Sequence, residues 1–343
     1  MRMKIRNGPG AAAPVTLQRV AERAGVSAST VSRILNGTAI VSAAKKQAVD
    51  DAIAQLGFVP NPVARGLAGG RTLSVGVVTQ AINSPFYGVA LRGIEDELGG
   101  AGYSPLFVSG HWNADDEARC IETLRARRVD GIIVFSGRLG DSALRACARA
   151  LPVVVTGRSL KATGLHSLNF DNFEGGRLAT RHLIGLGHRR IAFIGGEPEH
   201  PDAVERQRGY LAALEEAGLG VDARLFASGL YTEQSGLDAT ERLFGARASF
   251  SALFAANDQM AFGAALALHR RGLVVPQDVS LVGFDDVPSA SYTIPPLTTV
   301  HQPIYEVGRI AAAAMLEMLR GLKTRLQLPA PQLVVRESTR GRR

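Results

Sequence analysis

The sequence predicts a small all-α domain at the N-terminus, followed by a larger α/β domain that is built as two lobes. Apolar residues recur at helical spacing within the first sixty residues, whereas from residue 72 onward short β-branched runs alternate with amphipathic helical patterns. The charge divides at the same place. Residues 1–71 hold ten Lys and Arg against three Asp and Glu, which is +7 of the net charge of +8 carried by 343 residues.

Three short helices are expected in the N-terminal domain. Each pattern is preceded by a hydroxyl residue that can cap a helix and is followed by residues that tolerate the left-handed conformation. The expected caps are Thr16, Ser27 and Ser42, and the expected stops are Gly25, Asn36-Gly37 and Gly57. The side chains expected to face inward are Leu17, Val20, Ala21, Ala24, Val31, Ile34, Leu35, Val49, Ile53 and Leu56.

The first two helices, in residues 16–36, predict a helix-turn-helix. A glycine-containing turn joins them, and in such a unit the N-terminal residues of the second helix meet base edges in the major groove. The local excess of positive charge fits a nucleic-acid partner, and Arg33 can pair bidentately with guanine. A generic three-helix bundle and a solvated basic tail are the alternatives. The residues expected to contact DNA are Thr16, Ser27, Ala28, Ser29, Thr30, Ser32, Arg33 and Asn36.

The stretch from Val15 to Gly37, with its continuation from Leu56 to Arg65, resembles the headpiece of the lactose-repressor (LacI/GalR) family. The resemblance implies a sequence-specific transcriptional regulator, most members being repressors, whose operator affinity is controlled by a small-molecule effector. It further implies that residues 61–71 form a hinge helix on operator DNA, with Asn61 and Ala64 at the DNA and Leu67 wedged into the minor groove. Gly66 weakens such a helix, so a flexible linker without a DNA role remains the alternative.

Beyond residue 72 the alternation of strands and helices predicts parallel sheets covered on both faces, with a ligand cleft at the carboxyl ends of the strands. Expected strands are Leu73–Val78, Ser104–Val108, Gly131–Phe135, Val153–Thr156, Arg190–Ile194, Ala252–Ala255, Ser280–Phe284 and Gln332–Val335. Expected helices are Tyr87–Leu98, Asp115–Arg127, Phe173–Leu186, Val204–Ala217, Thr232–Phe244, Gln259–Arg271 and Pro303–Leu319.

The same family resemblance extends over this region, for example through Asn83–Tyr87, Ala256–Ala261 and Val282–Asp286. It implies a periplasmic-binding-protein-like effector domain that also dimerises. The expected division is a disordered tail at 1–14, a helix-turn-helix domain at 15–60, a hinge at 61–71, an effector domain at 72–339 and a basic tail at 340–343. Within the effector domain, one lobe takes 72–170 and 303–325, and the other takes 171–300 and 326–339.

A sugar or sugar derivative is the expected effector, because carboxylates, amides and a guanidinium can hold paired hydroxyls while an aromatic ring covers an apolar sugar face. The resemblance implies Asn83, Phe86, Arg206, Asn257 and Asp285 as contacts, with Asn172, Gln302 and Trp112 as further candidates. Other interpretations remain open. Asn172 and Asn257 can simply cap helices, Arg206 can pair with Glu205 or Asp202 on the surface, and Trp112 can be a packing residue. Gly157, before Arg158, stands where many relatives carry a carboxylate or an amide.

Several classes of protein are disfavoured. No apolar run is long enough to span a membrane, the N-terminus lacks the apolar core of a signal peptide, and Cys120 and Cys147 have no metal-type spacing. No nucleophile motif, phosphate loop or metal cluster indicates an enzyme or a cofactor. The expected partners are a pseudo-palindromic double-stranded operator, a carbohydrate effector and a second copy of the chain, in the cytoplasm at the nucleoid. A sugar-binding protein of a transporter and an architectural DNA-binding protein without an effector are the alternatives.

Overall fold

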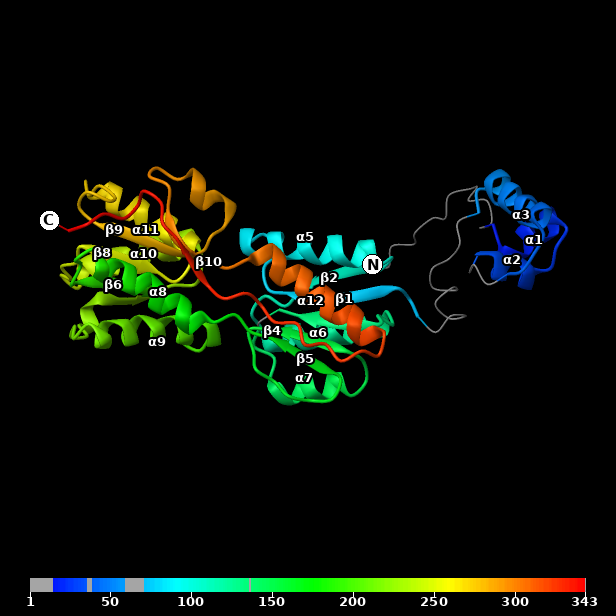
Figure 1. Ribbon diagram of the computed structural model, residues 1–343, viewed down its shortest axis with the longest axis horizontal. Coiled ribbons are helices and arrows are strands. Elements are labelled where there is room, and N and C mark those ends of the chain that lie inside the picture. The colour runs from blue at the N-terminus through cyan, green and yellow to red at the C-terminus, as the bar shows by residue number, and fades with distance from the viewer. Residues whose placement is uncertain (1–14, 36–38, 59–70, 136, 343) are drawn as a thin grey trace, which may run out of the picture. The chain divides into compact units, whose positions relative to one another are not determined.

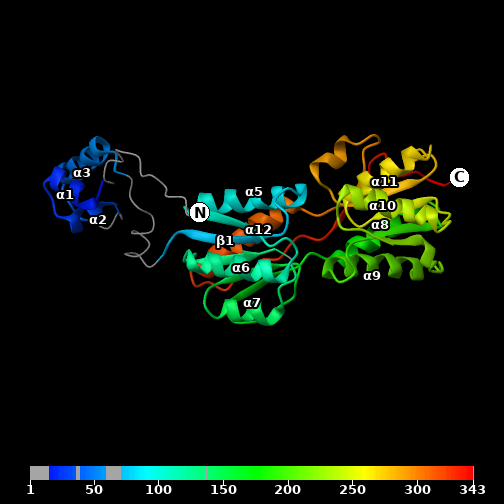
Figure 2. The ribbon, with the colours of Figure 1, turned by 180° about the vertical axis from the view of Figure 1, so that it is seen from behind.

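The computed structural model describes residues 15–35, 39–58, 71–135 and 137–342. The chain forms two compact units, Met1–Thr72 and Leu73–Arg343. Figures 1 and 2 show three helices in the first unit and two sheets flanked by helices in the second. No helix in the described residues is long and apolar enough to cross a membrane.

Three helices form the N-terminal unit: α1 (Leu17–Ala24), α2 (Ala28–Leu35) and α3 (Ala43–Leu56). Their shared core is Val20, Val31 and Val49, all with no solvent exposure. Val31, on α2, thus fills the space between the helices as predicted. The core is small, so turn chemistry contributes much of the definition of the unit.

The predicted caps of these helices are largely confirmed. The Thr16 hydroxyl accepts from the Arg19 backbone N–H at 3.4 Å, and the Ser27 hydroxyl accepts from Thr30 N–H at 3.2 Å. Gly25 follows α1 with φ of 67°, the left-handed conformation that only glycine adopts without strain. Ser42 occupies the N-cap of α3, but its side chain makes no capping hydrogen bond, so that part of the prediction is wrong.

The first lobe of the larger unit contains a parallel sheet of five strands in the order β2-β1-β3-β4-β5. Helices cover both faces, because one buried cluster lies under α5 and α12 and another lies under α6 and α7. The strands are β1 (Ser74–Thr79), β2 (Ser104–Ser109), β3 (Gly131–Val134), β4 (Val153–Thr156) and β5 (Leu165–Leu168). The helices are α5 (Pro85–Gly100), α6 (Ala114–Ala126), α7 (Asp141–Ala148) and α12 (Ile304–Leu319).

The second lobe contains a sheet of six strands in the order β11-β10-β9-β8-β6-β7. Its last strand, β11, pairs antiparallel with β10, so the prediction of purely parallel sheets is wrong at this edge. The strands are β6 (Ile191–Gly195), β7 (Phe226–Ser228), β8 (Ala252–Ala255), β9 (Ser280–Asp285), β10 (Thr298–His301) and β11 (Gln332–Val334). The helices are α8 (Asn172–Gly185), α9 (Pro201–Glu216), α10 (Glu233–Gly245) and α11 (Asp258–Arg270).

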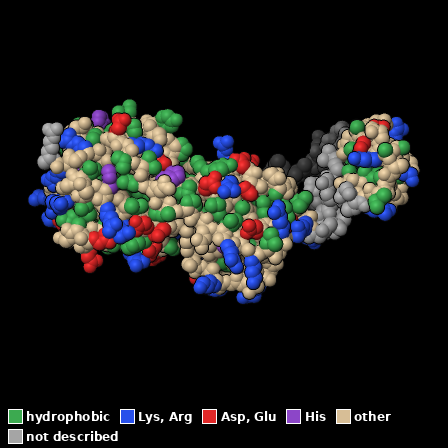
Figure 3. Space-filling view, in the orientation of Figure 1, with side chains coloured by type: hydrophobic (Ala, Val, Ile, Leu, Met, Phe, Trp, Pro, Cys, Tyr) green, Lys and Arg blue, Asp and Glu red, His purple; other side chains and the backbone are tan. Residues whose placement is uncertain are grey.

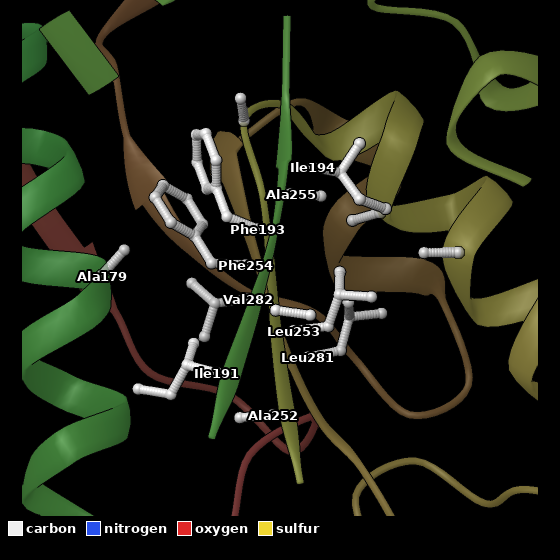
Figure 4. Packing of buried hydrophobic residues seen from close by; sticks show 14 of the residues in the cluster. Ala179, Ile191, Phe193, Ile194, Ala252, Leu253, Phe254, Ala255, Leu281 and Val282 are labelled. Atoms are coloured by element: carbon white, nitrogen blue, oxygen red, sulfur yellow. The ribbon is translucent and has the colours of Figure 1, made fainter. Parts of the chain in front are cut away.

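Alternation along the strands builds the core of the second lobe. Figure 4 shows Phe193 and Phe254 pointing to the face covered by Ala179 of α8, while Ile194 and Leu253 point to the opposite face. All five side chains are at most 1% exposed. A sheet buried on both faces leaves only its strand ends and loops free to carry polar side chains.

Three connections join the two lobes. The chain passes from β5 to α8, returns from β10 to α12, and passes again from α12 to β11. The last helix therefore packs on the first lobe while the last strand completes the second, as the sequence predicts. Such a triple crossing allows the two lobes to change their mutual angle about a shared hinge.

Candidate functional sites

The N-terminal end of α2 presents small polar side chains and one arginine. Ser29 and Arg33 are exposed. The Ser27 hydroxyl lies 2.9 Å from the Ser29 hydroxyl and 2.8 Å from that of Thr30, and Arg33 Nε donates to Ser29 O at 3.4 Å. These contacts order a short hydroxyl cluster at the end of the helix that the sequence assigns to the major groove.

Basic side chains surround this helix within the N-terminal unit, and Lys and Arg appear on the face of that unit seen in Figure 3. The exposed basic residues among those described are Arg19, Arg23, Arg33, Lys45 and Lys46. Such a cluster supplies the sequence-independent attraction to phosphates on which DNA binding depends. Four predicted DNA contacts lie outside the described residues: Asn36, Asn61, Ala64 and Leu67.

A cavity of about 290 Å³ lies between the lobes of the larger unit. The loops after β1 and β2 form one wall, and the loops after β6, β7, β8 and β9 form the other. This is the carboxyl edge of both sheets, where open α/β folds bind ligands. The lining residues are Ala81, Asn83, Ser84, Phe86, Tyr87, Trp112, His200, Asp202, Arg206, Leu230, Tyr231, Thr232, Glu233, Asn257, Gln259 and Asp285.

Arg206, on α9, is the buried cation of this cavity, with 4% exposure. Its Nε donates to Asn172 Oδ1 at 2.8 Å, and its two terminal nitrogens donate to Ala256 O at 2.5 Å and to Gln302 Oε1 at 3.3 Å. The guanidinium also lies 3.7 Å from the centroid of the Phe284 ring. These partners fix its orientation, and the alternative of a surface ion pair for Arg206 is wrong.

Two carboxyl groups accompany the guanidinium. Asp285 Oδ1 lies 3.4 Å from Arg206 Nη2, without hydrogen-bond geometry, and Asp202 Oδ1 accepts from Asn172 Nδ2 at 3.0 Å. Burial raises the pKa of Asp285 to about 7, although Arg206 opposes the shift. Burial raises the pKa of Asp202 as well. The cavity therefore holds protons that exposed carboxyl groups would release.

Aromatic rings from both lobes close the cavity. Trp112 follows β2 and meets His200, which precedes α9, with ring centroids 4.6 Å apart. His200 also meets Tyr231 at 5.6 Å, and Tyr87 meets Phe86 at 5.2 Å. Burial and the nearby Arg206 lower the pKa of His200 to about 4, so its ring is neutral at pH 7. Its Nδ1 accepts from the Asp202 backbone N–H at 3.2 Å, which leaves the proton on Nε2.

Two family models match the chain. One is described as bacterial regulatory proteins, lacI family, and matches residues 16–61; the other is described as a periplasmic binding protein-like domain and matches residues 180–339. The HTH-type transcriptional regulator AscG of Escherichia coli (strain K12) is 36% identical over 316 residues, which is 89% of this chain and 92% of AscG. The chain belongs to the LacI family of bacterial regulatory proteins. It is a transcriptional regulator, which confirms the prediction that it is not an enzyme and removes support from the transport alternative.

Solved LacI-family structures share both parts of the fold. The lac repressor dimer bound to operator and the anti-inducer ONPF matches with a TM-score of 0.88 at 31% identity, over 96% of this chain and 100% of that one. A complex of the transcriptional regulator CelR with cellobiose matches with a TM-score of 0.71 at 36% identity, over 94% of this chain and 99% of that one. The predicted fold class, a helix-turn-helix headpiece with a periplasmic-binding-protein-like domain, is confirmed.

Among the candidate effector contacts of this LacI-family chain, six line the 290 Å³ cavity: Asn83, Phe86, Trp112, Arg206, Asn257 and Asp285. Asn257 also caps α11, since its Oδ1 accepts from Met260 N–H at 2.9 Å. Trp112 combines the two roles considered for it, because it packs on the first-lobe core and reaches the cavity.

Two candidates lie elsewhere. Asn172 and Gln302 are absent from the wall of that cavity and instead hold Arg206 from behind. Asn172 does not cap α8 either, because Asp171 does so by accepting from Glu174 N–H at 2.9 Å. Both are supports for the guanidinium.

Sequence reasoning missed several cavity residues, above all Asp202, His200, Tyr231 and Glu233. A signal for two of them exists in the sequence, because His200-Pro201-Asp202 begins the helix that carries Arg206. Asp202 and Arg206 are four residues apart and therefore share one helix face.

A second hollow of about 830 Å³ lies beside the cavity and shares His200 and Asp202 with it. Arg138 of the first lobe forms an ion pair with Glu197 of the second at its edge. Arg158 hydrogen-bonds to the carbonyls of Gly137 and Leu139, so the departure at Gly157 and Arg158 leaves an arginine that holds the loop after β3. Within the described residues, no cluster of His, Cys, Asp or Glu suits a metal ion.

Proposed function

We propose that this LacI-family regulator is a repressor that binds a pseudo-palindromic operator as a homodimer and releases or holds it according to a small carbohydrate bound in the 290 Å³ cavity. The observation that carries the proposal is the pairing, in one chain, of a basic helix-turn-helix unit with an interlobe cavity built on a buried arginine and carboxyl groups. The site of action is the nucleoid, in the cytoplasm, where the operator is found.

On the DNA side, the exposed end of α2 supplies the readers. Ser29 offers a permissive hydroxyl, and Arg33 offers the guanidinium that suits guanine. The hinge proposed for residues 61–71 adds Asn61 and Ala64 beside the DNA and the Leu67 wedge at the centre of the operator. Two copies are required, because one headpiece reads only half of a pseudo-palindrome.

On the ligand side, the predicted contacts that line the cavity act together with those that sequence reasoning missed. Asp285 and Asn257 suit paired hydroxyls, and Trp112 suits an apolar sugar face. Asn172 and Gln302 act through Arg206. The domain limits proposed from the sequence, a headpiece at 15–60 and an effector domain at 72–339, divide these two activities between separate parts of the chain.

Selection of binding sites from a random duplex library with the purified full-length chain tests the DNA half. Enrichment of a pseudo-palindrome is expected. Arg33→Ala should lower affinity for the enriched site by ten- to a hundredfold and relax preference at one base of each half-site. Arg181→Ala, which changes an exposed arginine of the second lobe, is the matched control and should leave DNA affinity unchanged. A library that enriches no common sequence would contradict the proposal.

The effector half is tested on the same selected site. A panel of sugars and polyols is added to the protein–DNA complex, and fluorescence anisotropy reports release or retention of the duplex. Because coupling is reciprocal, DNA must change the affinity for the active compound by the factor that the compound changes the affinity for DNA. Independent affinities would show that the cavity does not control the helix-turn-helix.

A further inference from the structure

The charged side chains on the cavity wall are mostly acidic. Among the described lining residues, Asp202, Glu233 and Asp285 carry carboxyl groups, while Arg206 is the one guanidinium or ammonium group. Glu233 is joined to the first lobe through Gln259, whose Nε2 donates to Glu233 at 3.0 Å and whose Oε1 accepts from the Ser84 hydroxyl at 3.3 Å. The carboxyl groups therefore belong to both the floor and the closure of the cavity.

Arg206 is poorly placed to act as an anion receptor. Each of its three nitrogens already donates a hydrogen bond to Asn172, Ala256 or Gln302. Its charge faces Asp285 at 3.4 Å. A phosphate or carboxylate placed here would meet a cation that is already engaged, and would lie beside carboxyl groups in a medium of low dielectric constant, where like charges repel strongly.

Polar atoms without partners point to a different kind of ligand. Asp285 Oδ1 and His200 Nε2 are buried and make no hydrogen bond, and the two residues are only 5% and 8% exposed. The first can accept and the second can donate, since the His200 Nδ1 position is taken by the Asp202 N–H. A hydroxyl group both donates and accepts, so it can satisfy either of them without bringing a charge into the cavity.

The size and the lining of the cavity limit the ligand further. Its volume of about 290 Å³ lies at the lower end of ligand pockets, which span roughly 300–1,000 Å³. Trp112, Phe86 and Tyr231 add aromatic surface that suits the C–H face of a sugar ring.

We propose that the cavity selects a small polyhydroxylated ligand without an anionic group and rejects phosphorylated or carboxylated sugars. Asp202, Asp285 and Glu233 exclude the anion, and the neutral His200 and the aromatic rings hold the uncharged ring. This inference rests on the proposed function only for the location of the effector. It adds the charge class of that effector.

Matched pairs of probes test the selection by isothermal calorimetry on the full-length chain. The pairs are D-ribose with ribose 5-phosphate and D-glucose with glucose 6-phosphate and gluconate; cellobiose and inorganic phosphate are tested alone. At least one neutral sugar should bind, and its anionic counterpart should bind at least tenfold more weakly. An anionic member that binds as tightly as its neutral partner, tight binding of inorganic phosphate, or binding by none of the neutral sugars would overturn the inference.

Variants identify the cause of the selection. Asp202→Asn and Glu233→Gln keep the shape of the side chain and remove one carboxylate each. Each should narrow the preference for neutral over phosphorylated sugar by about tenfold. Glu199→Gln makes the same change in the neighbouring 830 Å³ hollow and should leave the preference unchanged. Equal preferences in all four proteins would show that the carboxylates do not exclude anions.

This measurement separates the inference from the proposed function. If a neutral sugar binds but leaves DNA affinity unaltered, the charge class stands and the regulatory role fails. If a sugar phosphate releases the selected DNA site, the regulatory role stands and the charge class fails.

Discussion

Asp285 should make the larger unit less stable as pH rises towards neutrality, and Asp285→Asn should remove that trend. The pKa of this carboxyl is raised by burial from 3.8 to about 7, with Arg206 opposing and Asp202 adding to the shift. A raised pKa of an acid means that the folded state keeps a proton that the unfolded chain has released. The associated stability is therefore present below about pH 4 and is lost as pH rises to about 7.

The size of the effect follows from the two pKa values. Each pH unit in this window costs about 1.4 kcal/mol, so the penalty grows by about 2 kcal/mol between pH 5 and pH 7. Asp202 and Asp258, whose pKa values are also raised by burial, contribute a trend of the same sign in both proteins and cancel in the comparison. The stability of Asp285→Asn relative to the parent should thus rise by about 2 kcal/mol across that interval.

Urea unfolding at pH 5, 6 and 7, followed by far-ultraviolet circular dichroism, measures the difference. Loss of the Arg206 contact shifts the difference by a constant at every pH, so only its change with pH reports the ionisation of Asp285. Asp238→Asn, on the exposed face of α10, is the control and should show no trend in this interval. A difference between Asp285→Asn and the parent that stays constant from pH 5 to pH 7 would refute the reasoning.

Three shorter predictions concern other parts of the chain. Gly25→Ala should destabilise the N-terminal unit by about 1–2 kcal/mol, measured by thermal unfolding of residues 1–72, because φ at this position is 67°. Glu117→Gln should lower the free energy of unfolding by about 1–3 kcal/mol, since the fully buried carboxylate accepts from the Arg138 and Leu139 backbone N–H groups at 2.8 and 2.7 Å. Trp112 is the single tryptophan of the chain and meets His200 at 4.6 Å, so a ligand in the cavity should change the intrinsic fluorescence.

Long apolar elements could be predicted from the sequence, whereas short and polar ones could not. The strands at Gly131 and Ala252 are β-branched or apolar throughout and lie in sheet centres, where burial on both faces dictates composition. The missed strands are β5, with His166 and Ser167, the three-residue β7, and β10, where two threonines begin the strand. Their strand conformation comes from pairing with a neighbour, which a local pattern does not contain. The missed helix α7 has only eight residues, too few for a clear period.

The candidate site was predicted to within one layer of side chains. Arg206 and Asp285 were assigned to the cavity from the family resemblance, and both line it. Asn172 and Gln302 were assigned to the same wall, but their side chains turn towards the guanidinium. Position along the chain locates a residue at the carboxyl edge of a sheet. Whether it contacts a ligand or a neighbouring side chain depends on rotamers that only the packed structure defines.

The adjacent carboxylates at the end of β9 suggest how occupancy of the cavity reaches the hinge. Asp285 and Asp286 both have positive φ, 104° and 58°, which turns the backbone sharply after the strand. Asp285 lines the cavity, while Asp286 accepts from Arg336 Nη2 at 2.6 Å and from His301 Nδ1 at 2.9 Å.

His301 ends β10 directly before the second crossing between lobes, and the Gln302 N–H donates to Asp285 O at 3.3 Å. A ligand that draws Asp285 into a new hydrogen bond therefore pulls on the backbone that leads into α12. Because α12 packs on the first lobe, the displacement is delivered at the interlobe hinge. Asp286 and Arg336 anchor the other side of the turn, so the motion is concentrated in the crossing strand instead of being absorbed by the second lobe.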